Sequence, residues 1–126
     1  MRQVIAIFVL ILGFLSPVVA RPDLDLGPPK NAKAPPIGAP LDQTGTPRSM
    51  ESLMGKKGMV FFFFRSAAWC PYCQLQLMEL DKGVSDIEKR GYKLVGISYD
   101  QPGVQAGFIA EHGIKYTLLS DPKSEV

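Results

Sequence analysis

Two cysteines separated by two residues are the feature of this sequence best suited to chemistry. They are Cys70 and Cys73, in the run WCPYC, and the chain contains two cysteines in all. A disulfide between them would close a very small loop, so it would remove little entropy from the unfolded chain and stabilise the fold poorly. The same spacing suits a pair that cycles between dithiol and disulfide. We therefore predict a redox-active pair.

Two other interpretations of the cysteines compete with this one. In an exported protein the pair could be a plain structural disulfide. It could also contribute to a metal site, but His112 is the only histidine and a structural zinc site needs four ligands. We therefore expect no metal ion, and we expect no cofactor.

The residues on either side of the pair indicate how a thiol would be activated. Six apolar residues, Met59 to Phe64, predict a strand that is buried on both faces. Helix-forming residues follow from Gln74, so Cys70 should lie at a helix N-terminus, where Pro71 is tolerated. Unpaired N–H groups and the helix dipole favour a thiolate there. We expect Cys70 to attack the substrate and Cys73 to resolve the product as an intramolecular disulfide.

Neighbouring side chains are candidates for tuning the pair. Trp69 and Tyr72 would shape an apolar lip for the substrate, with ordinary packing beside the strand end as the alternative. Pro71 and Tyr72 would set the reduction potential, for which about 30 mV corresponds to 1.4 kcal/mol. Arg65 could stabilise the thiolate or be solvated at the strand end. We do not expect His112 to be catalytic, because it lies at the far end of a later helix.

A helix from Cys70 to about Arg90 is predicted by its apolar period and its stop signal. Steps of four, three, four and three residues relate Cys73, Leu77, Leu80, Val84 and Ile87. This stripe should pack on the core, which places Cys73 inside and leaves Cys70 exposed. Gly91 supplies the stop signal.

The remaining pattern predicts an α/β fold. Tyr92–Ser98 reads as a strand parallel to the first one, with the helix as a right-handed crossover between them. We expect a second helix at Val104–His112 and a short strand at Tyr116–Leu119. Leu41–Leu53 should form a turn at Gly45 between two short extended pieces.

The N-terminal segment 1–20 has the pattern of a cleavable secretory signal. One positive charge, Arg2, precedes an apolar run from Val4 to Leu15. This run is shorter than the roughly 20 residues that span a bilayer. Cleavage is expected after Ala20, which would make the protein periplasmic or secreted. An uncleaved membrane anchor is the alternative.

The rest of the chain divides into a linker and one domain. Six of the eleven prolines lie in residues 21–40, which predicts an extended tether before a domain at 41–126. The formal net charge of +2 is too small to indicate nucleic acid as a partner. We also expect no stable membrane contact once the signal is cleaved.

From about Ile37 onward the sequence resembles the thioredoxin-like redoxins, specifically the peroxiredoxin-like branch of alkyl hydroperoxide reductase and thiol-specific antioxidant proteins. The motifs that carry the resemblance are Leu-Asp-x-x-Gly at 41–45, GKKG at 55–58, FFFFRSAAWCPYC at 61–73, RGYKLVGISYD at 90–100 and LLSDP at 118–122. The resemblance implies a thioredoxin-like fold, a central sheet with flanking helices. It also implies an antioxidant oxidoreductase that acts on a hydroperoxide or a disulfide and receives electrons from a thiol protein.

Two departures from the family pattern modify this expectation. Standard peroxiredoxins carry Thr or Ser three residues before the peroxidatic cysteine, whereas here that position holds Ala67 or, if Cys73 is peroxidatic, Cys70. This favours disulfide exchange or a self-resolving CxxC peroxidase over a standard peroxidase. The family's cis-proline hairpin, last helix and active-site arginine are also expected beyond Val126. We therefore predict an incomplete domain, with a truncated non-catalytic fragment as the alternative.

Overall fold

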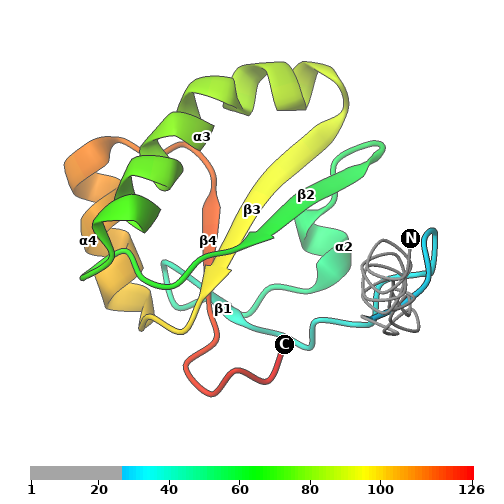
Figure 1. The fold of residues 1–126 in the computed structure, drawn as a ribbon, viewed down its shortest axis with the longest axis horizontal. Helices are drawn as coiled ribbons and strands as arrows, with labels where there is room; N and C mark the ends of the chain where they lie inside the picture. The colour runs from blue at the N-terminus through cyan, green and yellow to red at the C-terminus, as the bar shows by residue number, and fades with distance from the viewer. Residues whose placement is uncertain (1–26) are drawn as a thin grey trace, which may run out of the picture. The chain divides into compact units, whose positions relative to one another are not determined.

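The computed structural model describes residues 27–126, so the predicted signal segment lies outside the described residues. Its elements in chain order are β1 (Leu41–Asp42), α2 (Met50–Leu53), β2 (Gly58–Phe63), α3 (Pro71–Lys89), β3 (Tyr92–Ser98), α4 (Pro102–His112) and β4 (Thr117–Ser120) (Figure 1). None of the helices described is long and apolar enough to cross a membrane.

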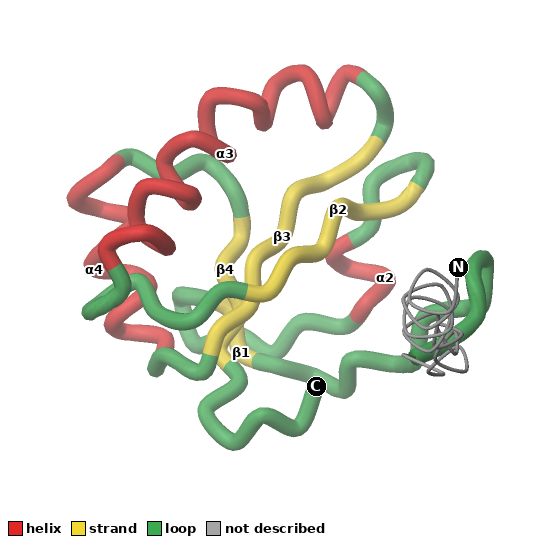
Figure 2. The backbone as a smooth tube through the Cα atoms, viewed as in Figure 1, coloured by secondary structure: helices red, strands yellow, loops and turns green. Residues whose placement is uncertain are grey.

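The sheet has four strands in the order β1-β4-β3-β2. β2, β3 and β4 run parallel, and β1 pairs antiparallel with β4. The predicted β-α-β unit and the thioredoxin-like α/β class are confirmed. Because parallel strands end at the same edge of a sheet, the loops that follow β2, β3 and β4 gather there (Figure 2).

Helix α3 begins and ends almost where its sequence pattern indicates. Cys70 is its N-cap residue, Pro71 is its first residue, and Arg90 caps its C-terminus. Three residues of the predicted stripe are buried, and Leu80 and Ile87 pack against the same core. The apolar period therefore identified the buried face correctly.

Two apolar clusters cover the two faces of the sheet. α3 and α4 lie on one side and α2 on the other (Figure 1). The first cluster includes Leu77 and Phe108 from the helices, together with Leu118 of β4. The second cluster joins Leu53 of α2 to the opposite face and also includes Ile37. Ile37 belongs to a compact unit that begins at Pro35, so the last part of the predicted linker is packed against the sheet.

A buried tyrosine ties α3 to the segment before β4. The hydroxyl of Tyr116 donates to the carbonyl of Leu77 at 2.9 Å. Burial, with a contribution from the Asp81 carboxylate, raises the pKa of Tyr116 well above its ordinary value. The phenol therefore stays protonated and remains a donor over the physiological pH range.

The prediction that the apolar strand is buried on both faces is wrong. β2 is an edge strand that pairs only with β3 among the described strands. Val60 is 41% exposed and Phe63 is 67% exposed. The backbone N–H of Phe64 donates to Ile97 of β3, so the alternate residues Met59, Phe61 and Phe63 direct their backbone groups away from β3.

The predicted turn at Gly45 between two short extended pieces is confirmed: Leu41 bridges Pro47 in antiparallel fashion, and the N–H groups of Asp42 and Arg48 donate to the carbonyls of Thr46 and Pro40. The first piece is β1, and Gly45 has φ +79 in the turn that follows it. The last four residues of this stretch, Met50–Leu53, form the short helix α2, which the sequence pattern did not predict. The Ser49 side chain accepts from the Ser52 N–H at 3.3 Å and caps this helix. The serine cap therefore marks the point where the second extended piece ends and the helix begins.

Two glycines should respond to alanine in opposite directions. Gly83 lies inside α3, and an added Cβ would meet nothing within 4 Å, so Gly83→Ala should stabilise the protein by about 0.5–1 kcal/mol. Gly96 lies in β3, where an added Cβ would come within 2.8 Å of the Phe62 ring and 2.9 Å of the Leu118 side chain. Gly96→Ala should therefore destabilise it by about 1–3 kcal/mol.

Urea unfolding followed by circular dichroism measures both changes. A Gly83→Ala variant no more stable than the parent would contradict the open space described around this position.

Candidate redox site

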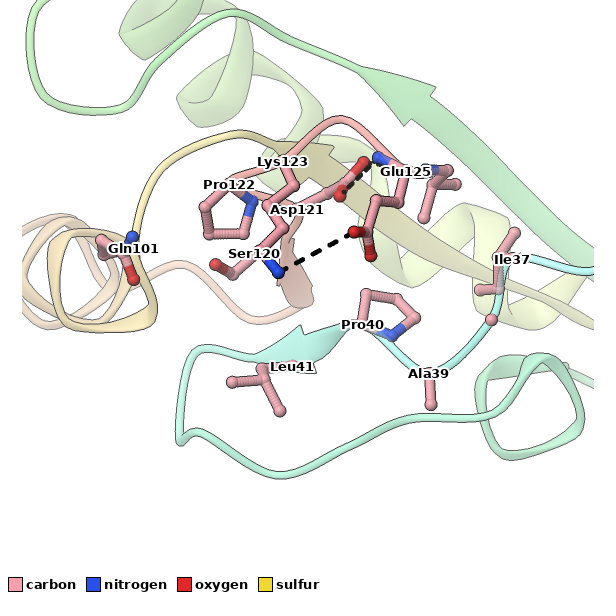
Figure 3. Close-up of a pocket in the computed structure, with 12 residues that line it drawn as sticks. Ile37, Ala39, Pro40, Leu41, Gln101, Ser120, Asp121, Pro122, Lys123 and Glu125 are labelled. Carbon is pink, nitrogen blue, oxygen red and sulfur yellow. Dashed lines mark hydrogen bonds and ion pairs between the residues drawn. The ribbon is translucent and has the colours of Figure 1, made fainter.

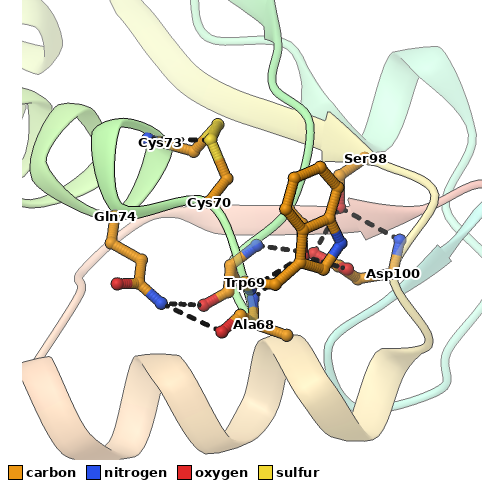
Figure 4. The surroundings of a disulfide bond; sticks show 9 residues. Ala68, Trp69, Cys70, Cys73, Gln74, Ser98 and Asp100 are labelled. Carbon is orange, nitrogen blue, oxygen red and sulfur yellow. Dashed lines mark hydrogen bonds between the residues drawn. A yellow bond between two sulfur atoms is a disulfide. The ribbon is translucent and has the colours of Figure 1, made fainter.

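The two cysteines meet in the first turn of α3. Cys70 has an extended backbone (φ −102, ψ 95), and its sulfur accepts a hydrogen bond from the Cys73 N–H at 3.3 Å. The Cα atoms are 5.2 Å apart, and the two side chains form a disulfide while α3 keeps its helical hydrogen bonding (Figure 4). The Cys70 sulfur therefore occupies the N-cap position, where a negative charge is stabilised.

The prediction that Cys70 is exposed is wrong in this disulfide-bonded form. Cys70 is 7% exposed and Cys73 is 8% exposed. Both belong to the same apolar cluster as Phe64 and Ala67, which precede them in the chain. The loop turns back toward the core before α3 begins, so it buries the first sulfur as well as the second.

A carboxylate at the end of β3 anchors this loop. Asp100 accepts from the Ala67 N–H at 2.7 Å and from the Ser66 hydroxyl at 2.8 Å. The Ser66 oxygen in turn accepts from the N–H groups of Ala68 at 3.0 Å and Trp69 at 3.4 Å. Three successive peptide N–H groups before Cys70 are thus directed inward.

The Gln74 side chain, which belongs to α3, donates to carbonyl groups of the same loop. The Gln74 amide donates to the Ala67 oxygen at 2.7 Å and to the Ala68 oxygen at 3.3 Å. Figure 4 shows Gln74 reaching from the helix toward Ala68 beside the disulfide. N–H and carbonyl groups of the loop therefore both have partners, which fits a rigid connection.

Aromatic side chains are exposed near the pair. Trp69 is 51% exposed, Tyr72 is 85% exposed, and Phe63 ends β2 with its ring largely in solvent. The Arg65 guanidinium lies 4.6 Å from the centre of the Trp69 ring, a cation–π contact. Trp69 and Tyr72 are thus exposed beside Cys70 in the sequence, and Arg65 contacts Trp69. Their roles in tuning or in substrate binding remain predictions, as does that of Pro71.

The surface of the unit that includes residues 35–126 has hollows, and two of them are well defined. One, of about 470 Å³, lies between the loop and α4 and is lined by Ala67, Ala68 and Gln74 on one side and by Phe108 and His112 on the other. The His112 ring packs on Phe108, with 4.4 Å between ring centres. The other hollow, of about 660 Å³, lies between residues 37–41 and 120–126, and neither cysteine lines it (Figure 3). No cluster of potential metal ligands occurs among residues 27–126.

Sequence reasoning missed three residues of this site: Ser66, Gln74 and Asp100. One signal could have identified Asp100. It lies two residues after the strand Tyr92–Ser98, and the carboxyl ends of parallel strands share one edge of the sheet, which places Asp100 on the same edge as the loop after β2. No local pattern singles out Gln74, because its contact depends on how the loop folds back over α3.

Comparisons with known proteins agree on one family. A model of the AhpC/TSA family matches residues 31–126. A putative peroxiredoxin from Mycobacterium tuberculosis is 35% identical over 94 residues, which is 75% of this chain and 58% of that protein. The chain thus spans little more than half the length of this relative.

Solved structures give the same fold. The crystal structure of the peroxidoxin BcpB from Mycobacterium tuberculosis matches with a TM-score of 0.60 and 31% identity, over 69% of this chain and 56% of that one. A secreted disulfide oxidoreductase from the same organism, described as homologous to Escherichia coli DsbE, matches with a TM-score of 0.52 and 25% identity, over 66% of this chain and 59% of that one.

The position of Cys70 predicts an acidic thiol in the reduced protein. In a Cys73→Ser variant, the Cys70 thiol should ionise below the ordinary pKa of about 8.5, because the N-terminus of α3 stabilises the thiolate. The ultraviolet absorbance of the thiolate, followed against pH, measures this pKa. The Cys70→Ser variant is the control, and its remaining thiol should ionise at higher pH. A Cys70 thiol that titrates like free cysteine would refute the N-cap argument.

Proposed function

The chain belongs to the AhpC/TSA family, and on that basis we propose that it is an exported thiol-dependent oxidoreductase whose redox centre is the Cys70–Cys73 pair. One observation carries the proposal. The Cys70 sulfur caps α3, and Cys73 lies close enough to bond with it inside the intact first turn. A pair in this position can pass between dithiol and disulfide without rebuilding the helix.

With a hydroperoxide, the reaction would proceed in two steps. The Cys70 thiolate attacks the terminal peroxide oxygen, the O–O bond breaks, and the leaving alkoxide takes a proton to form an alcohol. Cys70 is then a sulfenic acid. The Cys73 thiol attacks its sulfur, which releases water and forms the intramolecular disulfide. An external thiol protein returns two electrons and restores the dithiol.

Disulfide exchange is a second candidate reaction. Here the Cys70 thiolate attacks a substrate disulfide and forms a mixed disulfide, which releases the first substrate thiolate. Cys73 then attacks the Cys70 sulfur, and the second substrate thiolate leaves. The secreted disulfide oxidoreductase among the structural neighbours supports this alternative.

The Ser66 side chain also favours exchange. A peroxide-orienting hydroxyl would have to be free to donate to the substrate, but the Ser66 hydroxyl is fully buried and donates to Asp100. Arg65 is exposed and stacks on Trp69. Within residues 27–126, neither side chain is therefore arranged to orient a peroxide. The exposed Trp69 and Tyr72 offer contact area to a polypeptide substrate.

Two assays with one reductant separate the two reactions. The reduced protein should reduce insulin disulfides and should consume hydrogen peroxide more slowly. Cys70→Ser should abolish both activities, because it removes the attacking sulfur. Cys73→Ser should accumulate a mixed disulfide that mass spectrometry detects, because the resolving thiol is missing.

Peroxide consumption without insulin reduction would refute exchange as the reaction. Full activity in Cys70→Ser would refute the redox centre itself.

Export is testable by the mass of the mature chain. When expressed with its own N-terminus in a bacterium, the protein should leave the cytoplasm and start at Arg21, with 126 − 20 = 106 residues. Leu10→Lys interrupts the apolar run and should leave the full-length chain in the cytoplasm. Gln3→Lys lies before the run and is the control that should still be exported. A full-length chain that remains in the membrane would instead indicate an uncleaved anchor.

A further inference from the structure

Asp100 is a buried carboxylate whose two oxygens both accept hydrogen bonds. The residue is 7% exposed. One carboxylate oxygen accepts from the Ser66 hydroxyl at 2.8 Å, and the other accepts from the Ala67 N–H at 2.7 Å and the Ser98 hydroxyl at 3.0 Å. Burial of a carboxylate is costly unless hydrogen bonds compensate for the lost water, and here both oxygens have them.

These contacts lead directly to the segment that precedes Cys70. Asp100 accepts the Ala67 N–H itself, and it orients the Ser66 hydroxyl so that the Ser66 oxygen accepts from Ala68 and Trp69. The peptide groups immediately before the first cysteine are thus tied to the end of β3. In Figure 4 Asp100 lies to the right of Ala68 and Trp69, and the disulfide lies above them.

The orientation of the Cys70 sulfur depends on this segment. The sulfur reaches the Cys73 N–H because Cys70 keeps an extended backbone just before α3 begins. Of the preceding N–H groups, that of Ala67 donates to Asp100, and those of Ala68 and Trp69 donate to the Ser66 oxygen. If the segment were free to rotate, those groups and the sulfur would lose their fixed positions relative to the helix N-terminus.

Asp100 is itself held from two other elements. The hydroxyl of Ser120, at the end of β4, donates to the Asp100 carbonyl at 2.6 Å. The Gln105 amide of α4 donates to the Ser98 oxygen at 3.1 Å and to the Leu119 carbonyl at 2.7 Å. The carboxylate is therefore a fixed point of the sheet edge.

We propose that Asp100 is a positioning residue for the redox pair: it fixes residues 66–69 so that the Cys70 sulfur caps α3 as a thiolate. This inference rests on the proposed redox function of Cys70. Asp100 acts through the Ser66 hydroxyl and the Ala67 peptide, and it does not react.

Positioning and simple charge predict opposite effects of one substitution. Asp100→Asn removes a negative charge, which by Coulomb's law alone would favour a nearby thiolate and increase its reactivity. The same change replaces an acceptor oxygen by an NH₂ donor, so at least one donor among Ser66, Ala67 and Ser98 loses its partner. If positioning dominates, the Cys70 thiolate is no longer held at the N-terminus of α3, and the reactivity of Cys70 falls.

The test measures Cys70 without any physiological substrate. In the full-length protein carrying Cys73→Ser, the rate of alkylation by iodoacetamide at a pH at least one unit below the Cys70 pKa of the parent is proportional to the thiolate fraction. Asp100→Asn should lower this rate roughly tenfold, the change that a rise of about one unit in the thiol pKa produces. Ser66→Ala should lower it in the same direction, because it removes the hydroxyl that relays the contact.

Asp81→Asn is the matched control. Asp81 also accepts a hydrogen bond from a backbone N–H, that of Lys115 at 2.7 Å. It lies eleven residues beyond Cys70 along α3, however, which is about 16 Å by helix rise. In the Asp81→Asn variant, Cys70 should be alkylated at the same rate as in the parent, even if the variant protein is less stable. A double variant of Asp100→Asn and Ser66→Ala should lose less reactivity than the product of the two single effects, because both act on one contact.

The outcomes separate this proposal from the proposed function. An unchanged or increased rate in Asp100→Asn would overturn the positioning role while leaving an acidic Cys70 intact in the parent. If Asp100→Asn does not fold, Ser66→Ala decides, and an unchanged rate there overturns the proposal. A parent thiol that ionises like free cysteine would instead remove the basis of the proposed function itself.

Discussion

The cost of burying polar groups at the carboxyl edge of a parallel sheet is the constraint on which this site depends. Three strands end together, and each is followed by a loop whose peptide groups need partners away from water. Asp100 meets this need for the loop after β2, and Ser98, Gln105 and Ser120 meet it for the other two strand ends. The start of α3, and with it the first cysteine, is positioned by the same hydrogen bonds that allow the edge to be buried.

The same arrangement accounts for the chemistry that the site can perform. A side chain such as Ser66 cannot both complete a buried network and orient an incoming oxygen. Its hydroxyl donates to Asp100, which is why the proposed reaction places the attack at the sulfur of the helix N-terminus and assigns the second sulfur as its partner. The chain keeps the fold of its family, while Ser66 and Asp100 beside the sulfur form hydrogen bonds within the protein.

Local patterns in the sequence predicted the elements whose structure is decided locally. The α3 stripe, the parallel pairing of β2 with β3 and the N-cap position of Cys70 follow from residue period, length and spacing. The exposure of Phe63 could not be predicted in this way, because it depends on which strand lies beyond β2. The burial of Cys70 depends on the path of residues 64–69, which long-range hydrogen bonds decide. The contact between Gln74 and the loop has the same non-local origin.

Among the strands that the structure describes, none covers the outer edge of β2, and this edge bears on how two copies of the chain would meet. An apolar edge strand is a template for further strands, and β2 itself contains neither a proline nor a charged residue to discourage pairing. Cations instead flank it, with Lys56 and Lys57 before its first residue and Arg65 after its last. In an antiparallel pair of identical strands, the lysines of each copy would face the arginine of the other. Like-charge repulsion at both ends would therefore oppose this pairing, as gatekeeper residues beside an apolar strand do.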